Sequence, residues 1–407
     1  MIDEQQIEQL IERLVDRIEQ ANLAFLEEIG KSIKQLGKLM PSKAQQLINI
    51  LKYGSNYNDI VYKISQITNL NIKDIDEIFH AFAEKDRLFY KQFYEYRNLS
   101  FTTYRENRAL VTQVQALANI TKNELANFMN TRALGYSVRD LNGNVVFKGL
   151  REVYTQVLDE AILNVGQGKS TFDTAMRNTL KQLGGSGLKT VDYKGRSMRL
   201  DSAIRMNMQG ALRNLHNETQ KIYGAEFDSD GIEISVHLNP APDHAEVQGR
   251  QFSNEEFNKF QNDIDAVDYK GKLFTSEFEG KDRRAISEYN CYHYIFSIIL
   301  GVSQPQYSNE QLQNIINENN KTINIDGKEY TKYECTQLQR KYETAIRKQK
   351  DIQILAKASG NDNLVLESQQ NITQLTNKYR EISKKANLPT KVDRLRVSGY
   401  KRVAIKK

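Results

Sequence analysis

An apolar stripe with helical spacing begins the chain and constrains its fold more than any other feature. Its members are separated alternately by four and three residues: Ile7, Ile11, Leu14, Ile18, Ala21 and Phe25. Side chains spaced in this way share one face of a helix. The pattern predicts a long amphipathic helix that continues to about Met40, where Pro41 interrupts it. Because an apolar stripe must be covered, we expect this helix to contact a second protein or another copy of the chain.

Helical spacing recurs over most of the remaining chain. We expect further helices at residues 58–68, 73–96, 105–130, 151–165, 171–183, 201–223, 332–358 and 363–386. The last two are joined at Ser359-Gly360-Asn361 and should form an antiparallel helical hairpin. Two segments have strand-like alternation around the turn dipeptides Asn142-Gly143 and Asp326-Gly327. The sequence therefore predicts a mostly helical α+β protein.

These patterns divide the chain into five regions. We expect a helical N-terminal region (1–130), a hairpin with helices (131–187), a small α/β core (188–307), a hairpin with a long helical pair (308–387) and a basic tail (388–407). The glycine-rich residues 184–187 are expected to form a flexible turn at one of the boundaries.

The net charge lies in the tail. The chain has 57 Lys and Arg against 51 Asp and Glu, a net charge of +6. Asp393 is the one acidic residue of the tail, which carries seven basic residues: Lys391, Arg394, Arg396, Lys401, Arg402, Lys406 and Lys407. A segment of this kind contacts DNA or an acidic partner, or is simply a solvated terminus.

Two function classes are excluded by composition. The apolar runs are much shorter than the roughly 20 residues of a membrane span, and the N-terminus lacks the pattern of a signal peptide. We therefore expect folding in the cytoplasm and no contact with a membrane. Two cysteines, Cys291 and Cys335, do not make a disulfide scaffold.

Residues 201–307 contain most of the candidate functional side chains. A predicted helix begins at Asp201, a suitable N-cap, and places Arg205 and Arg213 on one face. This face either contacts a partner or nucleic acid or is simply a solvated basic face of the helix. The alternation of residues 232–238 predicts a half-buried strand with His237 on its polar side. The sequence Pro240-Ala241-Pro242 then bends the chain before His244.

Four side chains in this region suit a metal ion. They are His237, His244, Cys291 and His293. Imidazole and thiolate are donors for four-coordinate zinc, and the alternative is a polar core satisfied by hydrogen bonds. A nucleophilic Cys–His pair is disfavoured, because alternating residues of one segment seldom face each other and no carboxylate is placed to orient the histidine.

These residues also belong to a recognisable pattern. It consists of Val236-His237, then Pro242-Asp243-His244-Ala245 with Gln248-Gly249-Arg250, and finally Asn290-Cys291-x-His293 and Gly301-Val302-Ser303. The pattern resembles the phage minor capsid protein 2 family, which is related to head-morphogenesis proteins of the phage Mu type. The family's usual arginine between the cysteine and the histidine is Tyr292 here.

The resemblance implies a structural protein of a phage head. It implies a core similar to the ADP-ribosyltransferase fold. It also implies contacts with the portal and the major capsid protein and homo-oligomers in the virion. The expected role is in head assembly and DNA packaging, with assembly in the bacterial cytoplasm. The alternative is an ADP-ribosyltransferase-like enzyme or toxin, with His237 holding the cofactor. That chemistry also needs a glutamate late in the domain, and no suitable motif is present. We therefore expect no enzyme activity.

Overall fold

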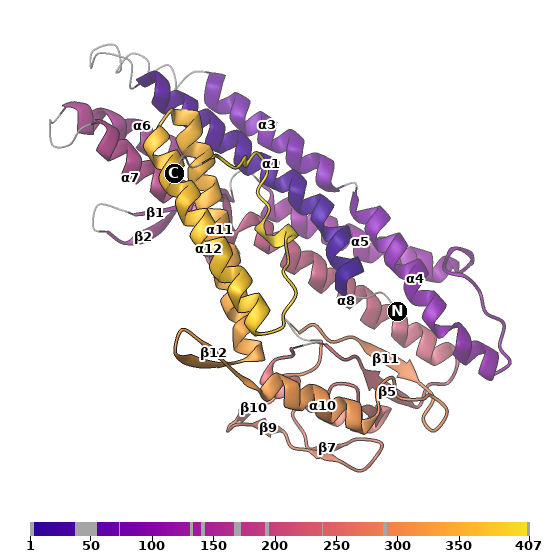
Figure 1. Ribbon diagram of the computed structural model, residues 1–407. Helices are drawn as coiled ribbons and strands as arrows, with labels where there is room; N and C mark the ends of the chain where they lie inside the picture. The colour runs from indigo at the N-terminus through magenta and orange to yellow at the C-terminus, as the bar shows by residue number, and fades with distance from the viewer. Residues whose placement is uncertain are drawn as a thin grey trace.

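Long helices form the body of the protein, and short strands gather at one end of it. The computed structural model describes residues 4–36, 55–72, 74–130, 133–139, 143–166, 172–191, 195–237, 239–287 and 291–404. Figure 1 shows the helices packed side by side in an elongated body, with a smaller lobe of strands below it. The predicted mostly helical α+β architecture is confirmed, while the division into five regions stays a prediction. No helix of the described residues is both long and apolar enough to cross a membrane.

The N-terminal stripe lies on helix α1 and is covered from within the chain. The helices of this region are α1 (Glu4–Leu36), α3 (Ser55–Ile72), α4 (Asp74–Tyr96) and α5 (Arg108–Phe128), with a short 3₁₀ turn η1 (Tyr104–Glu106). On α1, the stripe from Ile11 to Phe25 is buried against α3, α8 and α11. The expectation that it needs a second protein is therefore wrong, because the chain supplies that partner itself. The predicted helix end at Pro41 lies outside the described residues.

A four-stranded antiparallel sheet follows α5. Its strands are β1 (Leu134–Arg139), β2 (Val145–Gly149), β3 (Lys189–Val191) and β4 (Ser197–Arg199), in the order β2-β1-β3-β4. Between β2 and β3 run helices α6 (Leu150–Gly166) and α7 (Phe172–Ser186). The β1–β2 pair confirms the first predicted hairpin. Its turn residue Gly143 has a φ of +83°, a value that glycine adopts without strain.

The expected flexible turn at residues 184–187 belongs mostly to helix α7, which ends at Ser186. Gly184 packs against helix α11 (Lys332–Ser359): a Cβ at this position would lie 2.6 Å from the backbone nitrogen of Ile352. The glycine is thus required for close packing of two helices, and the prediction of a flexible turn is wrong.

Alanine at Gly184 and at Gly185 should change stability in opposite directions. We expect Gly184→Ala to destabilise the fold by about 1–3 kcal/mol, because its methyl group would push α11 away from α7. Gly185→Ala meets no atom within 4 Å and should stabilise the fold by up to about 1 kcal/mol, since alanine favours helix over glycine. Urea denaturation followed by circular dichroism measures both changes. A gain of stability for Gly184→Ala would contradict the close packing.

Helix α1 packs against helix α8 (Leu200–Glu226) and against α11, which forms the C-terminal hairpin with α12 (Asp362–Lys385). This hairpin confirms the prediction from residues 332–386. The N-cap of α8 is Arg199, without a side-chain capping bond, so the prediction for Asp201 is wrong. The carboxylate of Asp201 accepts instead from Arg199 Nε at 3.1 Å and pairs with Arg347 of α11.

A buried polar network joins these elements. Asp351 of α11 is completely buried, and its carboxylate accepts from Arg199 Nη1 and from Asn22 Nδ2, each at 3.0 Å. The amide oxygen of Asn22 accepts from the Tyr136 hydroxyl at 3.0 Å and from the Leu188 backbone nitrogen at 3.1 Å. One cluster of hydrogen bonds therefore connects α1, the four-stranded sheet and α11.

The basic tail is part of the helical body. Leu388 and Val397 are buried, and the backbone nitrogen of Ser398 donates to Glu19 of α1 at 3.0 Å. A 3₁₀ turn, η3 (Asp393–Leu395), precedes Arg396, which forms an ion pair with Asp16 at 3.1 Å. The interpretation of this segment as a solvated terminus is therefore wrong as far as residue 404, where the description ends.

The smaller lobe is built on a three-stranded antiparallel sheet with the order β11-β5-β6. Its elements are β5 (Gly231–Ile234), η2 (Pro242–His244), β6 (Gln251–Ser253), α9 (Asn254–Gln261), β7 (Ala266–Val267), β8 (Leu273–Phe274), β9 (Glu277–Phe278), β10 (Lys281–Asp282), β11 (Ile295–Ile298), α10 (Asn309–Asn320), β12 (Thr322–Ile325) and β13 (Lys328–Thr331). The β12–β13 pair confirms the second predicted hairpin. Strand β5 is buried on both faces, with Glu233 hydrogen-bonded to Gln251 at 2.7 Å. The prediction of a half-buried strand is wrong, because the rest of the chain covers both faces of β5.

Candidate metal centre

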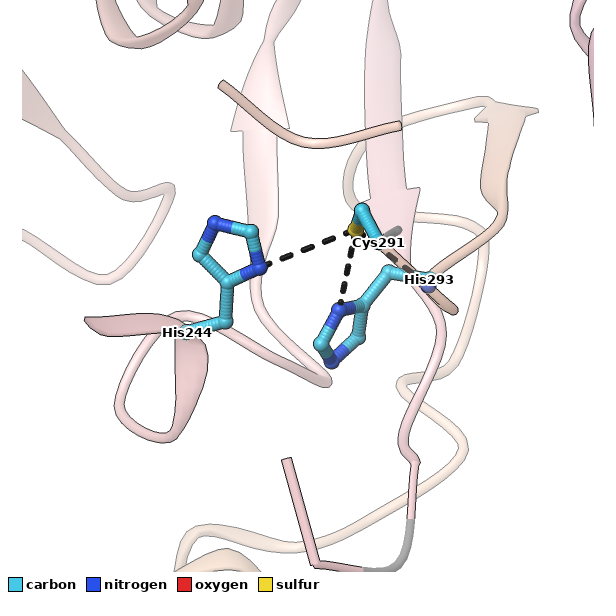
Figure 2. A group of neighbouring side chains, drawn as sticks. All are labelled: His244, Cys291 and His293. Carbon is cyan, nitrogen blue, oxygen red and sulfur yellow. Dashed lines mark hydrogen bonds between the residues drawn. The ribbon is translucent and has the colours of Figure 1, made fainter. Parts of the chain in front are cut away.

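Three of the four predicted metal ligands converge at one edge of the β11-β5-β6 sheet. The Sγ atom of Cys291 lies 3.6 Å from Nδ1 of His244 and 3.4 Å from Nδ1 of His293. Figure 2 shows both imidazole rings directed at the sulfur. The three ligand atoms all lie within 4.8 Å of one another. This is a compact group of one thiol and two imidazoles.

Strand pairing explains why residues far apart in the sequence meet here. Strands β5 and β11 are antiparallel, with Ile234 opposite Ile295. The chain that leaves β5 therefore lies beside the chain that enters β11, and the backbone nitrogen of Ser235 donates to the carbonyl of Tyr294 at 2.8 Å. Pro242 opens the 3₁₀ turn η2, which turns the chain back and carries His244.

Hydrogen bonds on the far side of each ring determine which nitrogen faces the sulfur. His244 donates from Nε2 to the carbonyl oxygen of Arg284 at 2.9 Å. His293 donates from Nε2 to Oε1 of Gln248 at 3.3 Å, and that oxygen also accepts from the backbone nitrogen of His237 at 2.9 Å. Because both Nε2 atoms act as donors, each Nδ1 faces Cys291, as a lone pair when its ring is neutral and as an N–H donor when its ring is protonated. Partners of this kind commonly orient histidines that bind metals.

The group is almost completely removed from solvent. His244, Cys291 and His293 are exposed by only 2%, 4% and 2%. Burial alone would raise the pKa of Cys291, but the hydrogen bonds with His244 and His293 lower it to about 5. Burial likewise opposes protonation of His244, yet the adjacent sulfur raises the pKa of that ring above its ordinary value. The cysteine is therefore held as a thiolate, the form that binds metals.

A pocket of about 350 Å³ adjoins the group. One wall comes from the face of α11 that carries residues three, four and seven positions apart: Tyr333, Thr336, Gln337 and Arg340. The other walls contain the three clustered side chains with His237, Asn239, Ala241, Arg284 and Tyr292. These lining residues include two arginines and no carboxylate. The guanidinium of Arg284 is paired with Asp243 at 2.6 and 2.7 Å.

The sequence was compared with family models, with curated proteins and with solved structures. Residues 2–382 match the family model described as phage minor capsid protein 2. The chain belongs to this family. No curated protein and no solved structure matches it. Membership of the phage minor capsid protein 2 family confirms the resemblance carried by the histidine and cysteine motifs. It gives the protein a structural role in a phage, among the components of the virion.

Of the four predicted ligands, His237 is the one that does not join the group of His244, Cys291 and His293. Its ring centroid lies 6.1 Å from that of His293 and 5.2 Å from that of Tyr292. The ordered strand ends at Ile234, so the predicted alternation no longer determines where residue 237 points. His237 lines the pocket without joining the three ligand atoms. Whether a metal binds stays a prediction.

The structure also changes the interpretation of Cys291 and His293 as neighbours. The sequence argument that alternating residues seldom face each other assumes an extended strand, and β11 begins only at Ile295. In the irregular segment before it, both side chains turn to the same side. The argument against contact was therefore wrong. His244 and His293 donate to the oxygens of a backbone carbonyl and an amide side chain, and the carboxylate of Asp243 also lies 3.9 Å from Nε2 of His244.

The predicted basic contact residues have different environments. Arg205 forms an ion pair with Glu12 of α1, and Arg213 is buried beside a second pocket of about 200 Å³. Neither lies on the exposed basic face that helical spacing suggested. Lys401 and Arg402 are exposed, and their contact with a partner or DNA stays a prediction. Lys406 and Lys407 lie outside the described residues.

Sequence reasoning missed several residues that complete the site. Gln248 was noticed as part of a motif, but its role as the acceptor for His293 was not. Arg284 and the α11 residues Tyr333 and Arg340 gave no signal at all, because nothing in their local pattern distinguishes them from ordinary surface positions. Tyr333 and Arg340 line the pocket only because α11 packs against the smaller lobe, and Arg284 lines it from within that lobe.

Proposed function

We propose that this protein is a minor component of the phage head that contacts the portal and the major capsid protein during head assembly and DNA packaging. The observation that carries the proposal is the family match over residues 2–382, which spans nearly the whole chain. The buried Asp351 network joins α1, the four-stranded sheet and α11. An elongated helical body stabilised in this way suits a structural role. Contact with other head proteins must use surfaces other than the covered stripe of α1.

An exposed apolar patch on the smaller lobe is the surface that best fits such a contact. It consists of Ile264, Val267, Tyr269 and Leu273, which are exposed by 53%, 37%, 52% and 55%. Val267 and Leu273 are paired across the β7–β8 hairpin. Figure 1 places β7 at the outer edge of the lobe, away from the long helices. Apolar side chains gathered at an accessible edge favour association with another protein.

Replacing Leu273 with aspartate should reduce incorporation of the protein into heads. Burying a leucine at an interface contributes about 1.5–3 kcal/mol, which corresponds to roughly a tenfold or larger change in affinity. We expect Leu273→Asp to fold normally, because the side chain is exposed. Quantitative mass spectrometry of purified heads would measure the number of copies per head.

Val145 provides the matched control for this experiment. It is exposed by 66% on β2, in the helical body and far from the patch in Figure 1. Val145→Asp should leave incorporation unchanged. If Leu273→Asp and the wild type were incorporated equally, the patch would not be the contact surface. If the wild-type protein were absent from purified heads, the proposed role in the head would be wrong.

Contact with packaged DNA would involve only part of the tail. Arg396 is paired with Asp16, whereas Lys401 and Arg402 are exposed close to the helical body. Three exposed cations of the described tail, one of them paired with Asp16, support a contribution to phosphate binding and not a separate DNA-binding domain.

The enzyme alternative gains no support from the pocket beside His237. Transfer of ADP-ribose requires a carboxylate near the reacting bond, and the residues that line this pocket include none. The core similar to the ADP-ribosyltransferase fold stays a prediction, and a fold of that kind would not by itself establish activity.

A further inference from the structure

We propose that His244, Cys291 and His293 bind a single zinc ion, with the fourth coordination position directed toward the pocket. This inference goes beyond a role in head assembly and is independent of it. Three observations carry it: the spacing of the donor atoms, the orientation of both rings, and the chemistry of the surrounding walls.

The distances between donor atoms match tetrahedral zinc. Zinc lies about 2.3 Å from a thiolate sulfur and about 2.0 Å from an imidazole nitrogen, so a tetrahedral angle separates sulfur from nitrogen by about 3.5 Å. The observed separations from Cys291 Sγ are 3.6 Å to His244 and 3.4 Å to His293. These two separations fit a single tetrahedral ion, and all three donor atoms lie within 4.8 Å of one another.

Hydrogen bonding alone leaves one of the two rings poorly satisfied. Each Nε2 atom already donates to an oxygen, of the Arg284 carbonyl or of Gln248. A neutral ring that donates from Nε2 is an acceptor at Nδ1, so two lone pairs are directed at one thiol. Cys291 has at most one proton to donate, and as a thiolate it has none, so at least one of the two lone pairs lacks a donor. A cation between the three atoms accepts electrons from all of them at once.

The donor atoms favour zinc over magnesium and calcium. Thiolate and imidazole donors favour zinc, whereas magnesium and calcium require oxygen donors, and the pocket offers no carboxylate. Three protein ligands with an open fourth position are typical of zinc sites that bind water or a partner group. Arg340 in the facing wall suits water or a small anion at that position.

Metal analysis of the full-length chain tests the proposal. After purification without chelators, wild-type protein should contain about one zinc ion per chain by inductively coupled plasma mass spectrometry. Cys291→Ser and His244→Ala should lose most of it. Gln248→Ala should weaken zinc binding about 10- to 100-fold, because its amide oxygen orients His293. Cobalt added to the metal-free wild type should produce the charge-transfer band of a cobalt–thiolate bond.

Two control variants separate ligand loss from other effects. Cys335→Ser changes the other buried cysteine, which packs in a separate apolar cluster, and should retain zinc. His237→Ala changes a pocket residue outside the ligand group and should also retain it. Zinc loss in His237→Ala would overturn the three-ligand assignment. Folded wild-type protein that binds no zinc and gives no cobalt–thiolate band would overturn the site, even if the ligand variants fail to fold.

Discussion

Asp351→Ala should lower the free energy of unfolding by about 3–5 kcal/mol, one of the largest effects expected from a single substitution in this chain. The change removes the acceptor for Arg199 and for Asn22. Arg199 is only 10% exposed, so its charge would remain buried with one partner fewer. Leaving a buried charge without its partner costs more than the pair itself contributes. Urea denaturation followed by circular dichroism provides the measurement.

The matched control is an acidic residue on the surface of the neighbouring helix. Glu381 of α12 forms ion pairs with Lys378 and Lys385, and its side chain is 40% exposed. We expect Glu381→Ala to change stability by less than about 1 kcal/mol. If Asp351→Ala were no more destabilising than Glu381→Ala, the buried network would not be what joins α1, the four-stranded sheet and α11.

Glu19→Gln should raise the free energy of unfolding, relative to the wild type, by about 3 kcal/mol more above neutral pH than it does in acid. Glu19 lies on α1 and is 7% exposed. Burial raises the pKa of its carboxyl from 4.5 to about 7, although the backbone N–H of Ser398 opposes the shift. Between these two pH values the folded chain holds a proton that the unfolded chain has lost. The contribution of Glu19 to stability is therefore complete below pH 4.5 and is lost as the pH rises through 7.

Glutamine cannot ionise, and its amide oxygen can still accept from Ser398. The difference in stability between Glu19→Gln and wild type should therefore grow between pH 4 and pH 8, while groups common to both chains cancel. Glu27→Gln, at an exposed position of the same helix, serves as the control. Urea midpoints at the two pH values test the prediction. A difference that does not change with pH would contradict the effect of burial on Glu19.

The pattern of apolar residues was sufficient where an element depends on its own sequence. The stripe from Ile11 to Phe25 predicted α1, and the segments at 332–358 and 363–386 predicted the C-terminal hairpin. Dipeptides such as Asp326-Gly327 predicted the turn between β12 and β13. In each case the side chains follow a period that a helix or hairpin imposes locally, so the pattern is visible without knowledge of any partner.

The same reasoning failed where a distant segment determines the environment. Glu233 looks like a surface residue by alternation, yet β5 lies between β6 and β11 and the carboxylate is buried. Gly184 looks like a flexible turn, yet Ile352 lies against it. Arg205 looks exposed, yet Glu12 is its partner. Periodicity describes one element at a time and carries no information about what packs on it.

For the candidate metal centre, too, local sequence predicted some features and tertiary packing decided the others. The sequence by itself determined the donor types, the family and the three candidates that the structure brings together, His244, Cys291 and His293. Only the tertiary structure decided that His237 stays outside, because pairing of β5 with β11 aligns the other segments while residue 237 lies beyond the strand. The acceptors that orient the rings and the α11 wall of the pocket were also decided there. Contacts between residues tens of positions apart depend on packing, and local sequence patterns do not encode it.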